Sequence, residues 1–138
     1  MLSCGTFYKQ YVHLSHVDDP PPNFIRNQPK FWPFFQGAIG AIDGTHINAC
    51  PSAAERHAAC NCKGGISQNC LACVSFDMEF LYILSGWEGS AADAIMYSHS
   101  RLMDLRIPVG KFYLTDAGFG ICNAMLIPYQ GVRYHLAE

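Results

Sequence analysis

The chain has 138 residues, half of them apolar and only 14% of them charged, which suits one globular domain with its own core. Its formal net charge of −2 argues against tight, sequence-independent binding of nucleic acid, which usually draws on clustered Lys and Arg. No apolar run approaches the roughly 18 residues of a membrane span or the core of a signal peptide, so we expect a soluble intracellular protein without a membrane partner.

Residues 1–30 are predicted to be a lead-in that contains a proline-rich linker. Three consecutive prolines at 20–22 exclude the interior of a helix and of a sheet. The aromatic cluster FWPFF at 31–35 carries a proline that prevents a long helix. We expect this cluster to form a short turn or a single helical turn packed in the core, and the folded domain to span residues 31–138.

A strand is predicted over residues 38–47, and it carries Asp43. The sequence AIDGTHI at 41–47 places this carboxylate directly before Gly44, which predicts an acid delivered into a glycine turn. An ordinary Asp-Gly turn without a function is the alternative interpretation. The polar stretch 48–68 that follows is expected to be a loop with a short helix at 53–59.

Two apolar runs at 70–76 and 80–87 are separated by a short acidic turn at 77–79. This pattern predicts an antiparallel hairpin. Because the apolar residues are continuous and do not alternate with polar ones, we expect both strands to be buried on both faces, at the centre of a covered sheet.

A helix is predicted over residues 91–103, with Ser90 as its N-cap. After a break at 108–110, the run at 111–116 forms the next strand and ends on Asp116. A right-handed crossover places this strand beside the Asp43 strand if the two run parallel in one sheet. The apolar face of the helix is expected to contain Ile95, Met96, Tyr97, His99 and Leu102.

Asp43 and Asp116 are the candidate site residues. Each ends an apolar run and is followed closely by glycine, and two acids at the ends of strands in one sheet predict a metal site. His46 is a candidate accessory residue near Asp43, with a simply packed or exposed histidine as the alternative. Asp93 is a second accessory candidate, although an acid at a helix N-terminus is also favoured by the helix dipole.

The seven cysteines are expected to be thiols, because their number is odd and no secretory signal precedes them. Cys60, Cys62, Cys70 and Cys73 also raise the hypothesis of a zinc site. The spacing argues against zinc, since strand positions three apart point to opposite faces of a sheet.

The ordered segments of the chain carry a family resemblance. AIDGTHI, SQN, SGWEGSAAD, GKFYLTDAGF and PYQGVRYHL, at 41–47, 67–69, 85–93, 110–119 and 128–136, together resemble the Harbinger/PIF-type DDE transposases and their domesticated nuclease relatives. The resemblance covers about residues 29–138. It implies an α/β fold with an RNase H-like mixed sheet and flanking helices, of which residues 31–138 would form a part that lacks the C-terminal portion.

The resemblance also implies that three acids hold two divalent ions, Mg²⁺ or Mn²⁺, for hydrolysis of DNA phosphodiester bonds at transposon ends. By motif, Asp43 matches the first acid and Asp116 the second. The third acid, a glutamate on a later helix, is expected beyond this chain, since Glu138 comes too early. We therefore expect little or no nuclease activity from the chain alone.

The family's usual setting implies a nuclear location and a possible separate DNA-binding partner protein. Cys60 and Cys62 stand where relatives tend to carry arginines, which removes two phosphate contacts. The alternative function is a non-catalytic, decayed or domesticated transposase fragment that acts as a DNA- or protein-binding module.

Overall fold

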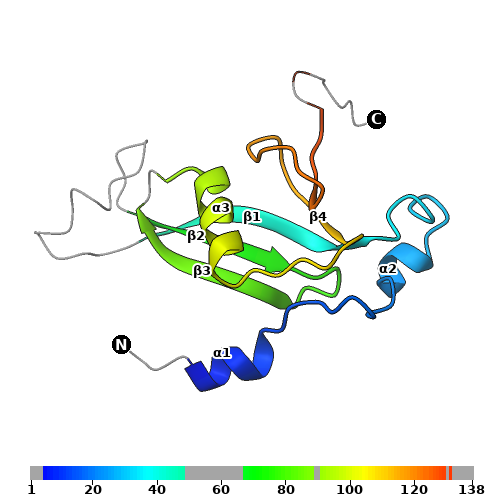
Figure 1. The fold of residues 1–138 in the computed structure, drawn as a ribbon, viewed down its shortest axis with the longest axis horizontal. Helices are drawn as coiled ribbons and strands as arrows, with labels where there is room; N and C mark the ends of the chain where they lie inside the picture. Colours follow the sequence, from blue (N-terminus) through cyan, green and yellow to red (C-terminus); the bar gives the residue numbers. More distant parts are fainter. Residues whose placement is uncertain (1–4, 49–66, 89–90, 130, 132–138) are drawn as a thin grey trace, which may run out of the picture.

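A computed structural model describes residues 5–48, 67–88, 91–129 and 131 (Figure 1). The predicted loop helix at 53–59 and the two cysteines at 60 and 62 lie outside these residues. Among the described helices, none has the length and apolar character needed to cross a membrane.

The centre of the described fold is one mixed sheet in the order β3-β2-β1-β4-β5. Strands β1, β2 and β3 are antiparallel neighbours, whereas β4 runs parallel to β1 and β5 runs parallel to β4. The predicted α/β fold is confirmed, and so is the parallel pairing of the strand that carries Asp43 with the one that leads to Asp116. The strands are β1 (Ala38–Asn48), β2 (Ser67–Val74), β3 (Phe80–Glu88), β4 (Phe112–Leu114) and β5 (Met125–Leu126).

The hairpin formed by β2 and β3 is confirmed, with its turn at 75–79 closed by a hydrogen bond from Ser75 N to Glu79 O (2.8 Å). Both strands of the hairpin were predicted to lie at the centre of the sheet. This prediction is correct for β2, which lies between β3 and β1. The prediction is wrong for β3, which forms the edge of the described sheet. An edge strand has a neighbour on one side only, and Ser85 and Gly86 of β3 are accordingly exposed.

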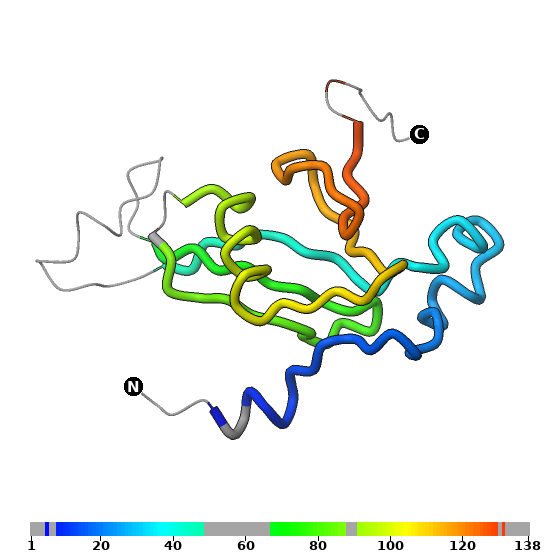
Figure 2. The backbone as a smooth tube through the Cα atoms, viewed as in Figure 1, coloured from blue at the N-terminus to red at the C-terminus, as the bar shows by residue number. Residues whose placement is uncertain are grey.

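Within the described residues, three helices flank the sheet: α1 (Gly5–Tyr11), α2 (Asn23–Arg26) and α3 (Asp93–Met103). Figures 1 and 2 show α3 lying across the strands β1 to β3, whereas α1 lies beyond the β3 edge. Ile25 of α2 is buried with 2% of its surface exposed, so this short helix packs on the domain through one side chain.

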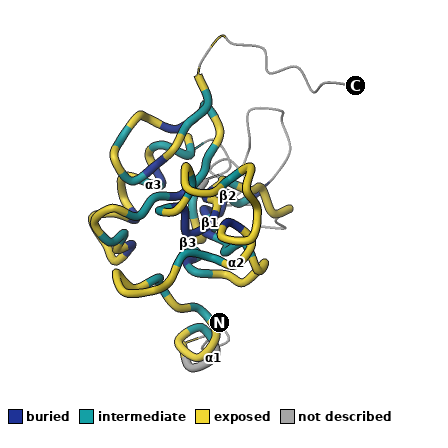
Figure 3. The backbone as a smooth tube through the Cα atoms, turned by 90° about the vertical axis from the view of Figure 1, so that its right-hand side faces the viewer, coloured by how far each residue is buried: buried dark blue, intermediate teal, exposed yellow. Residues whose placement is uncertain are grey.

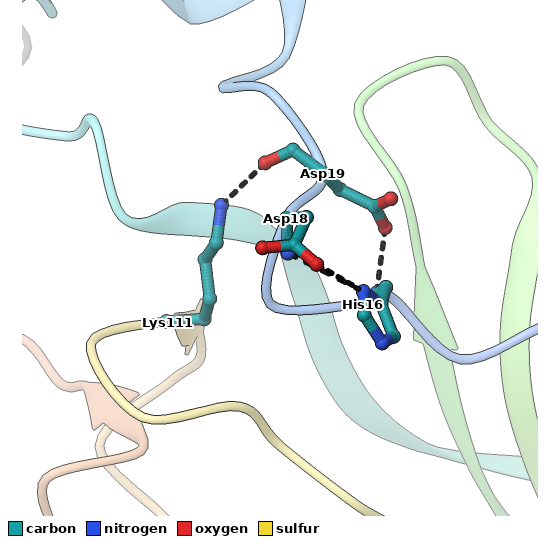
Figure 4. A network of polar contacts seen from close by, with 4 residues as sticks. All are labelled: His16, Asp18, Asp19 and Lys111. Atoms are coloured by element: carbon teal, nitrogen blue, oxygen red, sulfur yellow. Dashed lines mark hydrogen bonds and ion pairs between the residues drawn. The ribbon is translucent and has the colours of Figure 1, made fainter.

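The predicted lead-in contacts the sheet directly. The hydroxyl of Tyr8 accepts a hydrogen bond from the backbone N–H of Ile83 on the edge strand (3.2 Å). Lys111 Nζ donates to the backbone oxygen of Asp19 (2.8 Å), and the Asp19 carboxylate accepts from the backbone N–H of His16 (2.6 Å; Figure 4). These contacts attach the lead-in to the strands, and a domain boundary at residue 30 stays a prediction.

Helix α3 differs from its prediction at its start and on its buried face. It begins at Asp93 with Ala92 as the N-cap, and the predicted N-cap Ser90 lies outside the described residues. Met96 and Ser100, one turn apart, are the fully buried residues, whereas Ile95 and Leu102 are 57% and 85% exposed. The buried face of the helix is therefore a narrow stripe that contains Met96 and Ser100, and Ile95 and Leu102 lie outside it.

The aromatic cluster at 31–35 forms the predicted turn but is not part of the core. Phe34 is 79% exposed and Trp32 is 38% exposed. Phe31 instead packs on other aromatic rings, with centroid distances of 5.6 Å to Phe24 and 5.9 Å to Phe35. The rings therefore bury one another at the start of β1 and do not enter the layer between α3 and the sheet.

The main core lies between α3 and the facing side of the sheet, where Figure 3 shows buried residues on β1 and β2. Phe119 adds the segment that follows β4 to this core. Because residues from both ends of the sheet join one cluster, the relative positions of β1 and β4 are fixed by packing as well as by hydrogen bonds. The cluster contains Ile39, Ile42, Leu71, Cys73, Tyr82, Met96, Leu105, Tyr113, Phe119 and Met125.

Cys73 makes part of the stability of this core dependent on pH. Burial raises the pKa of the Cys73 thiol to about 12 from an ordinary value of 9.0. Between these two pKa values the folded chain keeps the thiol proton, whereas the unfolded chain releases it. The free energy of unfolding should therefore stay constant below about pH 9 and fall by about 1.4 kcal/mol per pH unit up to about pH 12. Urea unfolding between about pH 8 and about pH 11 measures the slope.

The control for this prediction is the Cys73→Ala chain, which lacks the thiol. Tyr82, whose pKa is also raised by burial and by its hydrogen bond to Asp104, is present in both chains. The difference between the two slopes therefore measures the Cys73 thiol together with its effect on the neighbouring Tyr113 hydroxyl. Equal slopes in the two chains would show that the thiol proton does not contribute.

Candidate functional site

Asp43 lies in the middle of β1, where it pairs with Ala72 of β2. The predicted glycine turn after it is wrong, because Gly44 continues the strand and pairs with Leu71. Ile42 is buried and Asp43 is exposed, so the carboxylate leaves the sheet on the face opposite to α3. Its Oδ1 accepts a hydrogen bond from the backbone N–H of Gly44 (2.8 Å), which fixes its orientation.

Asp116 lies two residues after the end of β4, as an acid that follows a strand. The backbone N–H of Thr115 still donates to Leu126 of β5 (3.2 Å), so the chain stays extended up to the acid. Asp116 is exposed, and its Oδ1 accepts from the backbone N–H of Gly118 (2.9 Å). Both acids thus have one carboxylate oxygen held by a nearby backbone N–H.

The parallel register brings the two acids to the same level of the sheet. Ala41 of β1 pairs with Leu114 of β4, and each acid follows its paired residue by two positions. Because side chains alternate along a strand, the two carboxylates leave the sheet on the face that Ala41 and Leu114 share. The register therefore places Asp43, on β1, level with Asp116, which follows the end of β4.

Asp93 reaches β1 from the other face. It is the first residue of α3, and its carboxylate occupies the space that a side chain at Gly44 would fill: a Cβ there would overlap the carboxyl carbon and both oxygens. Asn69 Nδ2 donates to Asp93 Oδ1 (3.3 Å). The structure therefore brings Asp93 to the residue next to Asp43, and its place in the first turn also suits the helix dipole.

His46 lies near the end of β1, directly opposite Asn69 of β2. Its Nδ1 is 3.3 Å from Ser67 Oγ, and alternation along the strand turns its ring toward the face of Gly44. The structure thus groups His46 with Ser67 and does not group it with Asp43.

Sequence reasoning did not identify Asn69 as a functional residue. Asn69 and Ser67 are each only 1% exposed, although they are polar. The polar SQN triplet at 67–69 begins an otherwise apolar strand, and this pattern could have indicated that Ser67 and Asn69 are functional. Buried polar side chains are retained where they bond to something specific, and Asn69 bonds to the start of α3.

The two aligned acids suit a hard divalent cation in donor type and position. Mg²⁺ in proteins is commonly bound through one or two carboxylates while it keeps several waters. Neither Asp43 nor Asp116 forms an ion pair with another described residue, so the carboxylates are not neutralised within the described part of the chain. That part contains no group of three His, Cys, Asp or Glu side chains arranged around one point.

Within the described part of the chain, Cys70 and Cys73 take no part in this site. Cys70 and Cys73 are buried thiols with 4% and 0% of their surface exposed, and Cys73 lies beside the Tyr113 hydroxyl in the core. Within the described ranges they belong to no cluster of metal-binding side chains. The zinc hypothesis, which also involves two cysteines outside these ranges, finds no support here.

The sheet order defines an α/β domain with a mixed sheet, a fold consistent with an RNase H-like domain. The family model of the DDE superfamily endonuclease matches residues 42–137, which is more than half of the chain and includes both acids. The chain therefore belongs to the DDE superfamily endonuclease family. Comparison with curated proteins and with solved structures gives no significant match.

Membership of this family carries a general expectation about chemistry. Endonucleases of the DDE superfamily act on DNA and generally use divalent metal ions. The exposed carboxylates of Asp43 and Asp116 are of the type that such ions bind.

Proposed function

We propose that this chain is the catalytic domain of a Harbinger/PIF-type DDE transposase or a derived nuclease, which hydrolyses DNA phosphodiester bonds at transposon ends. The observation that most directly supports the proposal is the register of β1 and β4, which places Asp43 on β1 level with Asp116, two residues after β4, inside the matched region. Strand backbones are rigid, and a rigid scaffold is what holds carboxylates at a fixed separation for catalysis.

In this proposal Asp43 and Asp116 hold Mg²⁺ or Mn²⁺. When bound, a pair of such ions supplies activation of the attacking water and stabilisation of the leaving oxygen. The chain's own contribution is to orient the carboxylates, through the N–H groups of Gly44 and Gly118, and to present them on an open face where a DNA strand can approach.

The proposal assigns accessory roles to Asp93 and His46, which lie on the opposite face of β1. Asp43 and Asp116 match two of the three acids that the resemblance implies, so we propose that these two acids alone support weak catalysis. The low content of cations supports a separate DNA-binding partner protein, and the family's substrate supports a nuclear location.

The test is nicking of supercoiled plasmid DNA by the purified chain with Mg²⁺ or Mn²⁺, together with thermal unfolding under the same conditions. We expect the metal ion to stabilise the chain against unfolding and to support slow nicking of the plasmid. Both effects should be lost in Asp43→Asn and Asp116→Asn. Asp77→Asn is the matched control, because Asp77 is an exposed acid in the hairpin turn.

Two results would contradict the catalytic proposal. One is that neither ion stabilises the chain or supports nicking that depends on these acids. The other is metal-independent binding of DNA without nicking, which would favour the alternative of a non-catalytic binding module.

A further inference from the structure

The side chain of Asn69 joins β2 to the start of α3. Its Nδ2 donates to the backbone oxygen of Ala91 (2.9 Å) and to Asp93 Oδ1 (3.3 Å). Only 1% of the residue is exposed, and its Oδ1 is buried without a hydrogen-bond partner among the described residues. Burial at this level fixes the amide, so the donor that meets Asp93 is held in one orientation.

The Asp93 carboxylate in turn rests on β1 at Gly44, where it takes the space of a missing side chain. The backbone N–H of the same Gly44 donates to Asp43 Oδ1 (2.8 Å). The contacts therefore run without a gap from Asn69 through Asp93 and Gly44 to Asp43. The residue type at position 44 is what allows this, because any Cβ would displace the Asp93 carboxylate.

We propose that Asn69 is a positioning residue, which holds the Asp93 carboxylate against Gly44 so that its negative charge strengthens the binding of a divalent cation at Asp43 and Asp116. This inference rests on the proposed function, since it concerns the same cation. The inference extends the site to Asn69 on β2, and it assigns Asp93 a defined action on the cation.

Asp93 acts on the cation through its charge and not as a direct ligand. Its carboxylate approaches β1 from the α3 side, whereas Asp43 leaves the strand on the other face, so one layer of backbone separates them. The negative charge of Asp93 can still attract a divalent ion across this layer of backbone, because a partly buried protein environment screens the charge less than water does. Among the described residues no Lys or Arg pairs with Asp93 to cancel the charge.

A purely structural role for Asn69 makes a different prediction. If Asn69 only fastened α3 to β2 through Ala91, its removal would lower the melting temperature and leave the affinity for the cation unchanged. The concentration of Mn²⁺ that gives half of the maximal thermal stabilisation distinguishes the two roles, since it is compared within each variant.

The experiment measures this Mn²⁺ midpoint in the full chain and in the variants Asn69→Ala, Asp93→Asn and the double substitution. We expect each single variant to raise the midpoint about tenfold, as loss of a residue that orients a metal site typically does. The double variant should be no weaker than Asp93→Asn alone, because Asn69 acts through Asp93. Ser100→Ala is the control: it removes a buried hydrogen bond of α3 to Tyr97 O, far from Asp93, and should leave the midpoint unchanged.

The outcomes separate this inference from the function on which it rests. Mn²⁺ binding that depends on Asp43 but is unchanged in Asp93→Asn overturns the inference and leaves the proposed function standing. Asp93→Asn keeps the size of the side chain, so it tests whether the charge of Asp93 strengthens Mn²⁺ binding even if Asn69→Ala does not fold. Absence of Mn²⁺ binding to the unsubstituted chain overturns both.

Discussion

The Asp43→Asn chain will lose the stabilisation that Mn²⁺ gives to the unsubstituted chain. At a Mn²⁺ concentration of about 100 times the dissociation constant, that stabilisation is about 2.7 kcal/mol. The amide keeps the size of the side chain and can still accept the hydrogen bond from Gly44, but it removes the charge that a hard cation binds. Asp116→Asn should behave in the same way, because its carboxylate lies at the same level of the sheet.

Thermal unfolding with and without Mn²⁺ measures this effect, and Asp77→Asn shows how much any exposed acid contributes. We expect Asp77→Asn to retain the full stabilisation, since the hairpin turn lies at the other end of β2 from Ser67 and Asn69. If Asp43→Asn responded to Mn²⁺ as strongly as Asp77→Asn, the cation would bind elsewhere.

Substitution of Gly44 by alanine should destabilise the fold as well as the site. The new Cβ would overlap the Asp93 carboxylate, so the start of α3 must move away from β1. Forcing an extra methyl group into a packed position typically costs about 1–3 kcal/mol. Gly120→Ala is the matched control, because a Cβ at Gly120 meets nothing within 4 Å, and its effect should stay below about 0.5 kcal/mol.

Urea unfolding of the single variants and of Gly44→Ala combined with Asp93→Ala measures this coupling. Shortening Asp93 removes the overlapping atoms, so the combined variant should lose less stability than the sum of the two single variants. Additive losses would show that Gly44 is required for a reason unrelated to Asp93.

Local sequence patterns were sufficient to predict the strands that carry the site. The apolar runs around Asp43 and before Asp116 became β1 and β4, and the two runs on either side of Met78 became the hairpin. These elements could be predicted because their apolar residues are contiguous and the turn is short. Strand β5, with only Met125 and Leu126, was not predicted, since so short a strand exists only through its pairing with β4.

The errors at Gly44 and Asn69 share one physical cause, which is a contact with a residue distant in sequence. An aspartate followed by glycine is typical of a turn, but Gly44 is a glycine because the carboxylate of Asp93 lies against it. The buried face of α3 was misjudged because it includes Ser100, a polar residue that hydrophobic periodicity does not count. The role of Asn69 depends on where α3 begins, which the hydrogen bonds to Ala91 and Asp93 reveal only in the folded chain.

Asp43 and Asp116 are proposed to bind the same divalent ions. Anomalous diffraction from crystals of the chain soaked in Mn²⁺ tests this, because it locates the ion independently of any activity. We expect a manganese peak within bonding distance of both carboxylates. A saturating soak that placed manganese only at other side chains, with both carboxylates free of metal, would contradict it.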